Sequence, residues 1–140
     1  MKIVVRAVGK LRDRRMDELC REYLDRVRHH LPIEVVEVEG DAQLVAALPT
    51  GAEVIALEPG GDSWTTAQLI HYLSERMLRG TRAVVFLIGG AEGLSPTTVA
   101  RAARRLSLSP LTLPHRLARV ILCEQIYRCV SAIRGEPYNK

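Results

Sequence analysis

No run of apolar residues in this sequence approaches the roughly 20 that are needed to cross a bilayer. The first residues also lack the continuous apolar core of a signal peptide, because Arg6 and Lys10 interrupt it. We therefore expect a cytoplasmic protein with no membrane partner.

Cysteine is scarce as well. Cys20, Cys123 and Cys129 are odd in number, scattered, and not in the spacing of metal ligands. They argue against a disulfide framework and favour reduced, packed thiols in a cytosol. No cluster of metal-binding residue types stands out elsewhere, so we expect no metal site.

Lysine and arginine are absent from residues 32–75, a stretch that carries eight Asp and Glu. Residues 76–140 contain eleven Lys and Arg against three acidic residues, and residues 1–31 contain nine against five. A polyanion would therefore meet the C-terminal part, together with the basic loop at 10–15. Simple solvation of these charges is the alternative, but so uneven a distribution favours nucleic acid or phosphate binding.

Length and overall composition are ordinary for a soluble globular protein. The chain has 140 residues, of which 47% are hydrophobic and 26% are charged. This length suffices to bury a core, and we expect one domain spanning residues 1–140.

Short β-branched runs alternate with amphipathic segments along the whole chain. We expect strands at 3–8, 33–38, 53–57, 83–88 and 105–109, and helices near 16–31, 41–48, 65–77, from 96, and at 116–134. Strands that alternate with helices predict an α/β fold, with a mostly parallel sheet and helices on both faces. Glu34 and Glu37 give the second strand a wetter pattern, which predicts an edge position.

The last expected helix mixes two kinds of residue on one side. Val120, Cys123, Tyr127 and Val130 fall among the charged residues, opposite a mainly apolar half. This mixture indicates either a subunit interface or substrate groove, or a core helix with a solvated arginine edge. The pattern does not decide between these alternatives.

Three segments follow strands at the edge of the sheet where ligands collect, namely 57–63, 88–94 and 109–115. Gly89, Gly90 and Gly93 would let backbone amides approach a ligand closely. Their loop is neither the dinucleotide-binding GxGxxG pattern nor a Walker loop. Taken alone it fits a phosphate site, a nucleoside site or a plain turn.

Five stretches of the sequence carry a more specific signal, and all lie in its C-terminal part. They read LIGGAEGL at 87–94, LSLS at 106–109, LTLPH at 111–115, EQIYR at 124–128 and GEPY at 135–138. Together they strongly resemble the RlmH family, the small α/β-knot (SPOUT-type) methyltransferases that modify 23S ribosomal RNA. The resemblance covers the whole chain, since residues 1–9 and 57–69 also fit.

The resemblance implies a C-terminal trefoil knot, S-adenosylmethionine as cofactor, and a homodimer with the knot regions at its interface. It also implies methylation of N3 of a pseudouridine in 23S ribosomal RNA, presented on free RNA, the large subunit or the assembled ribosome, and no DNA partner. The matching motifs imply cofactor contacts from Leu57, Gly90, Ser109, Pro110, Leu111, Thr112, Leu113 and Pro114. Because the methyl donor is already activated, neither a metal nor a covalent enzyme intermediate is required.

The catalytic base is not identified, and four residues are candidates: His115, Arg128, Tyr138 and Asn139. His115 fits a general base, but also a cap for the last helix or a residue that holds the knot. Tyr138 fits stacking on a base, or packing on its own subunit.

The expected RNA contacts are basic residues of the last helix and residues of the C-terminal tail after it. They are Arg119, Arg128, Arg134, Tyr138 and Lys140. Ion pairing with Glu124 is the alternative for Arg119 and Arg128. We also expect a composite site, with RNA contacts from the basic loop of one subunit and the tail of the other.

Asn139 departs from the family's closing Pro-Tyr-His-Lys pattern. This departure keeps open a second function, a catalytically inactive knot-fold protein that binds RNA or the ribosome. An amide cannot take up a proton at neutral pH, although it can donate and accept hydrogen bonds. We expect an active enzyme in which Asn139 orients the RNA base.

Overall fold

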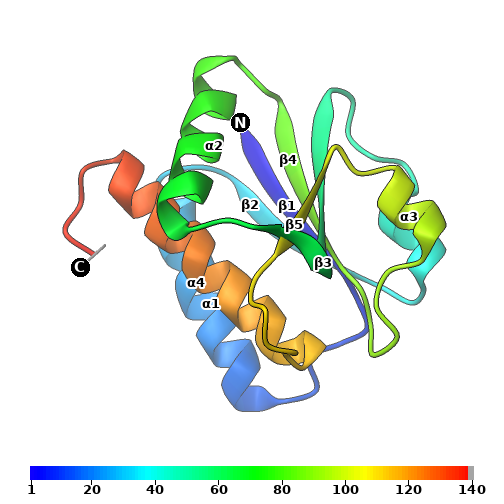
Figure 1. Cartoon of the computed structure of the whole chain (residues 1–140). Helices are drawn as coiled ribbons and strands as arrows, with labels where there is room; N and C mark the ends of the chain where they lie inside the picture. Colours follow the sequence, from blue (N-terminus) through cyan, green and yellow to red (C-terminus); the bar gives the residue numbers. More distant parts are fainter. Residues whose placement is uncertain (139–140) are drawn as a thin grey trace.

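The computed structural model describes residues 1–138 as an alternation of strands and helices (Figure 1). In chain order the elements are β1 (Lys2–Val8), α1 (Arg14–Arg28), β2 (Ile33–Val38), the short 3-10 helix η1 (Asp41–Val45), β3 (Ala52–Ser63), α2 (Thr66–Leu78), β4 (Ala83–Ile88), α3 (Pro96–Ala100), β5 (Arg104–Ser107) and α4 (His115–Ile133). The predicted α/β class is confirmed. Within residues 1–138 no helix is long and apolar enough to span a membrane.

The strands form a five-stranded sheet in the order β2-β1-β4-β3-β5, and every neighbouring pair is parallel. β4 lies at the centre and is buried along its whole length, as its uninterrupted apolar sequence requires. β2 lies at an edge with Glu34 and Glu37 exposed, which confirms the expected edge position. Because the strands are parallel, all of them end at the same edge of the sheet.

Helices cover both faces of the sheet (Figure 1). Side chains alternate along β1, so that Ile3 and Val5 join the cluster under α1, α2 and α4, whereas Val4 joins the one under η1 and α3. The predicted arrangement is therefore confirmed, although the layer formed by η1 and α3 is much the thinner of the two.

Local sequence determines where several helices begin. The Asp13 carboxylate accepts hydrogen bonds from the backbone N–H groups of Arg15 and Met16 and caps α1. Thr65 and Gln68 form a reciprocal capping box at the start of α2. Ser95 caps α3 as predicted, with a proline in the first turn.

Asp41 differs from its expected role as the cap of a helix reaching residue 48. It is the first residue of the shorter η1, and its carboxylate accepts hydrogen bonds from the backbone N–H of Ser95 (3.0 Å), from the Ser95 hydroxyl (2.6 Å) and from the Thr98 hydroxyl. Burial alone would raise the pKa of Asp41, but these hydrogen bonds outweigh burial and lower it. Asp41 therefore ties η1 to α3.

β3 is longer than predicted. The stretch after Leu57 was expected to be a loop, but the strand continues to Ser63, and both Leu57 and Asp62 pair with Leu106. Residues 58–61, which lie between these two pairs, leave the pairing with β5, and we call them the excursion. At Gly61 the backbone approaches so closely that a Cβ would lie 2.7 Å from the carbonyl carbon of Arg105, which only glycine allows.

α4 packs against α1 and α2 over the central strands. Val120, Cys123 and Val130 are buried within one chain, so the interpretation of α4 as a core helix is correct. Their position among charged residues gives no argument for a subunit interface. The three cysteines are free and buried, as predicted.

Arg119 of α4 is buried, with 3% of its surface exposed. Its guanidinium donates hydrogen bonds to the Glu37 carboxylate at 2.5 Å and to the Gly9 carbonyl oxygen at 2.8 Å. This burial contradicts the expectation that Arg119 contacts RNA. Its partner is also Glu37 of β2 and not the expected Glu124.

Candidate cofactor cleft and tail cluster

A cleft of about 770 Å³ opens at the edge where the strands end. It is lined by residues 57–59 within β3, by residues 88–94 and 107–109 at and after the ends of β4 and β5, by residues 111–115, and by Ala118 of α4. This volume falls within the range of small-molecule sites, roughly 300–1,000 Å³. The three segments predicted from their position after strands therefore meet at one site.

The chemistry of the lining suits an adenosyl cofactor that carries positive charge. Leu57, Ile88 and Leu113 supply apolar walls for an aromatic base, and exposed loop backbone supplies hydrogen-bonding groups. Glu58 and Glu92 add two carboxylates, which favour a cationic ligand. The residues present therefore fit S-adenosylmethionine.

The glycine loop after β4 is held by its own backbone. The N–H of Gly93 donates to the carbonyl oxygen of Gly90 at 3.0 Å, and Gly93 has a φ of 76°. A Cβ at Gly89 would lie 2.5 Å from the carbonyl carbon of Gly93. A Cβ at Gly90 would point at the Val8 side chain, 3.3 Å away, so Gly90 faces the cleft with its backbone.

The loop between β5 and α4 has a defined turn. The Ser107 hydroxyl donates to the Ser109 carbonyl oxygen, and the Ser109 hydroxyl accepts from the N–H of Leu111, both at 2.9 Å. Of the eight residues expected to contact the cofactor, all but Pro110 line the cleft. Pro110 is exposed on the outside of the turn.

His115 is the first residue of α4 and lines the cleft. The N-cap is Pro114, and no side chain forms a capping hydrogen bond. The alternative in which His115 caps the helix is therefore wrong. Among the candidates for the catalytic base within residues 1–138, His115 is the one that lines this cleft.

Arg128 and Tyr138 meet elsewhere, around Glu124. The Glu124 carboxylate accepts hydrogen bonds from Arg128 Nη2 at 2.7 Å and from the Tyr138 hydroxyl at 2.9 Å. The Tyr138 ring packs on Tyr127 with centroids 4.6 Å apart, and the Arg128 guanidinium lies over it. Burial, with the hydrogen bond to Glu124, raises the pKa of Tyr138. We call Glu124, Tyr127, Arg128 and Tyr138 the tail cluster.

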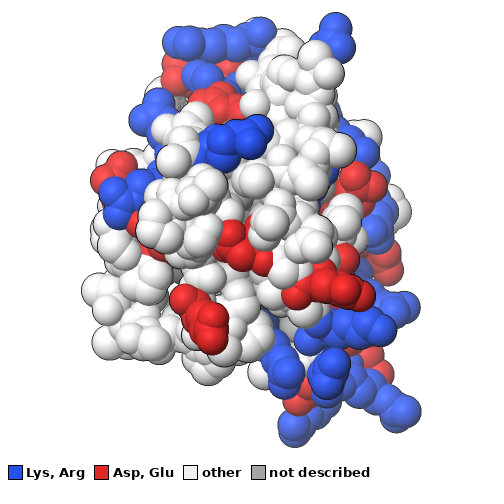
Figure 2. Space-filling model, turned by 90° about the vertical axis from the view of Figure 1, so that its right-hand side faces the viewer, with Lys and Arg blue, Asp and Glu red and all other residues white. Residues whose placement is uncertain are grey.

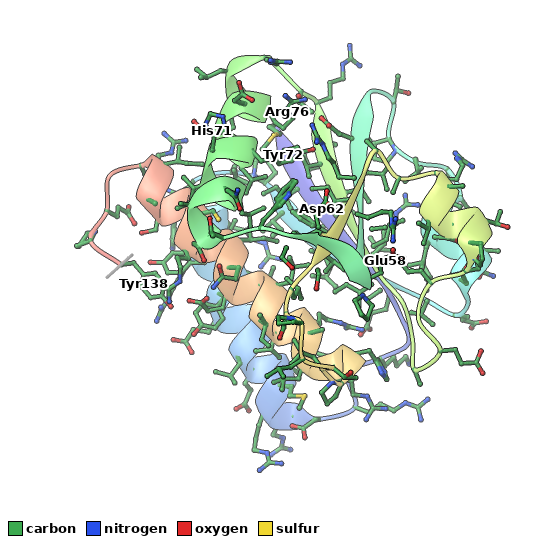
Figure 3. The ribbon with its side chains drawn as sticks, in the orientation of Figure 1. Glu58, Asp62, His71, Tyr72, Arg76 and Tyr138 are labelled. Carbon is green, nitrogen blue, oxygen red and sulfur yellow. The ribbon has the colours of Figure 1, made fainter. Side chains whose placement is uncertain are left out.

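The tail cluster is separate from the cleft in the same chain. Its residues do not line the cleft, and Figure 3 shows Tyr138 and Glu58 on opposite sides of α4. Glu124 lies six residues after Ala118, which corresponds to about 9 Å along a helix and a turn to a different face. Asn139 and Lys140 lie outside the described residues.

The loop between β1 and α1 carries several basic residues and leaves the sheet at the edge where the strands end. Figure 2 shows Lys and Arg gathered at the top and the lower right of one face, with acidic and uncharged side chains between them. The lower group lies at the height of this loop in Figure 1. Arg134, another expected RNA contact, is exposed and donates to the His30 carbonyl oxygen at 3.2 Å.

Sequence reasoning missed two parts of this arrangement. Glu58 lines the cleft although it was only part of an expected loop, and its position directly after Leu57 was the available signal. Glu124 was expected as an ion-pair partner, but not as the residue that joins Arg128 to Tyr138. Within residues 1–138 no group of His, Cys, Asp and Glu is placed to hold a metal ion.

Comparison with known proteins gives one consistent result. A family model described as a predicted SPOUT methyltransferase matches residues 1–139. The ribosomal RNA large subunit methyltransferase H of Sorangium cellulosum is 42% identical over 143 residues, with 99% of each chain covered. The protein of the same name from Gemmatimonas aurantiaca is 39% identical over 155 residues, with 100% of each covered. This chain therefore belongs to the SPOUT methyltransferase family.

Proposed function

We propose that this protein transfers a methyl group from S-adenosylmethionine to N3 of a pseudouridine in 23S ribosomal RNA. The observation that carries the proposal is the cleft at the carboxyl edge of β3, β4 and β5, whose lining includes seven of the eight expected cofactor residues. The names of the relatives, which are large subunit ribosomal RNA methyltransferases, suggest the class of substrate.

The bound cofactor would supply a methyl group that a sulfonium charge already activates. The task of the protein is then to hold the donor, exclude water and aim the acceptor nitrogen. Leu57, Ile88 and Leu113 would enclose the adenine, and the backbone around Gly90 and Leu111 would offer hydrogen bonds to it. Glu58 and Glu92 favour the positive charge of the donor over a neutral product.

We further propose that the active protein is a homodimer with a trefoil knot and a composite active site. The distance between cleft and tail cluster within one chain supports this arrangement, because Tyr138 cannot serve its own cleft while it is bound to Glu124. The tail of one subunit would instead reach the cleft of the other. Leu111 and Leu117, both exposed apolar side chains near the cleft, suit such an interface.

In this arrangement His115 and Asn139 have different tasks. His115 lines the cleft and has an imidazole that can accept a proton from the ring nitrogen or hold a neighbouring group. Asn139 follows Tyr138 and would orient the base by hydrogen bonds, as its amide permits. Arg134 and the basic loop at 10–15 would bind phosphates.

The proposal is tested by binding and transfer together. Calorimetry should give saturable binding of S-adenosylmethionine, and labelled methyl should pass to ribosomes from cells lacking this modification, with N3-methylpseudouridine as the product on nucleoside analysis. Cofactor binding without transfer to RNA, subunits or ribosomes would favour the inactive RNA-binding alternative. A species of 15.6 kDa by light scattering at micromolar concentration would contradict the dimer.

A further inference from the structure

Leu57, Glu58 and Pro59 of β3 line the cleft. Glu58 and Pro59 belong to the excursion from Glu58 to Gly61, which interrupts the pairing of β3 with β5. Such an excursion has no ladder hydrogen bonds of its own and needs other contacts to keep one conformation. Those contacts come largely from a single side chain, Arg105 of β5.

Arg105 holds the excursion at two points. Its Nε donates a hydrogen bond to Oε1 of Glu58, and its Nη2 forms an ion pair with the same oxygen. The Nη2 also donates to the Gly60 carbonyl oxygen at 3.2 Å. The backbone of Arg105 lies directly against Gly61, where a Cβ would not fit. Side chain and backbone of one residue therefore clamp the excursion between Glu58 and Gly61.

The clamp leaves one oxygen of the Glu58 carboxylate, Oε2, able to accept a hydrogen bond. Both contacts from Arg105 go to Oε1, and among residues 1–138 no partner is found for Oε2. The Glu58 side chain is only 18% exposed, and the residue lines the cleft directly after the last pair that β3 forms with β4 (Figure 3). A carboxylate that is half paired and mostly enclosed is a strong acceptor with a restricted orientation.

We propose that Arg105 is a positioning residue that fixes Glu58, whose free carboxylate oxygen accepts a hydrogen bond from the adenosyl cofactor. The donor is either a ribose hydroxyl or the α-ammonium group, since both present hydrogen atoms to an acceptor at a site of this kind. The inference rests on the proposed function, because it takes the cleft to be the cofactor site. It assigns a specific hydrogen bond to one of the two carboxylates that line the cleft.

The test is calorimetric binding of S-adenosylmethionine to four variants of the full chain: Glu58→Gln, Arg105→Gln, Arg105→Lys and Arg104→Gln. Glu58→Gln and Arg105→Gln should each weaken binding by about tenfold or more, the size expected for a hydrogen bond to a charged group. Arg105→Lys keeps the charge and should recover part of the loss. Arg104→Gln, the neighbouring exposed arginine of β5, is the matched control and should bind within about twofold of the parent protein.

A second ligand identifies the donor. 5′-Methylthioadenosine keeps the ribose but lacks the amino-acid part. If Glu58→Gln weakens its binding as much as that of S-adenosylmethionine, the ribose hydroxyls donate, and if only S-adenosylmethionine is weakened, the ammonium does. The double variant of Glu58 and Arg105 should bind no more weakly than either single variant, because both changes remove the same contact.

Hydrogen exchange of the ligand-free protein reports on the clamp without the cofactor. Arg105→Gln should speed the exchange of amides in residues 58–61, whereas Arg104→Gln should not. Unchanged cofactor affinity in both Glu58→Gln and Arg105→Gln, with the parent protein binding normally, would overturn this inference alone. A parent protein that binds no S-adenosylmethionine would overturn the proposed function as well.

Discussion

Replacing Arg119 by methionine tests whether this arginine anchors α4 to the sheet or serves RNA. Its guanidinium is almost wholly buried and donates to Glu37 at 2.5 Å and to the Gly9 carbonyl oxygen at 2.8 Å. Hydrogen bonds to charged groups contribute roughly 1.5–3 kcal/mol each. The Glu37 side chain is 38% exposed and can regain water when its partner is lost. We therefore expect Arg119→Met to lower the free energy of unfolding by about 2–3 kcal/mol, below the 3–5 kcal/mol seen when a buried charge is stranded.

Glu37→Gln should lower the free energy of unfolding by more than Arg119→Met does, because it leaves the buried guanidinium without a counter-charge. In a double-mutant cycle the two changes should couple by at least about 1 kcal/mol. Urea denaturation followed by circular dichroism measures each variant, with the protomer concentration held constant because association affects apparent stability. Arg134→Met is the control, since an exposed side chain should change stability by less than about 0.5 kcal/mol. An Arg119→Met protein as stable as the parent, but unable to bind RNA, would refute the anchoring role.

Three further changes have definite expected outcomes. Gly89→Ala places a Cβ 2.5 Å from the Gly93 backbone. It should abolish cofactor binding measured by calorimetry and lower the free energy of unfolding by about 1–3 kcal/mol. The lowered pKa of Asp41 means that its contribution to stability is present above the ordinary aspartate pKa near 3.9 and is lost as the pH falls through the lower folded value. Thermal unfolding between pH 5 and about pH 2 should therefore show a smaller loss of stability for Asp41→Asn than for the parent. Tyr138→Phe removes the hydrogen bond to Glu124 and should slow single-turnover methyl transfer by about fivefold while cofactor affinity is kept.

The parts of the fold that follow from neighbouring residues could be predicted from the sequence. The apolar run of β4, the glutamates of the edge strand and the Ser95-Pro96 start of α3 each identify their element locally. The position of the cleft also followed, because parallel strands bring their carboxyl ends to one edge. Seven of the eight cofactor residues that the family resemblance indicated lie in that cleft.

The predictions that the structure contradicts concern contacts between residues far apart in the sequence. Nothing near Arg119 reveals that Glu37 and Gly9 lie beside it, so its charge suggested a surface. The continuation of β3 to Ser63 depends on β5, which is made more than forty residues later. The apolar residues on the charged side of α4 looked unpartnered because one-dimensional periodicity cannot show that α1 and α2 pack on the helix from two sides.

The order of the sheet also constrains how the chain folds. β1 is made first, but one of its two neighbours is β4, with Ile3 opposite Val84, and the apolar side of α1 is covered by α4 near the end of the chain. Contacts so distant in sequence form slowly, because a long stretch of chain must be ordered before any of them stabilises the product. A chain that stops before His115 would therefore keep the apolar face of its first helix exposed, and we expect it to aggregate.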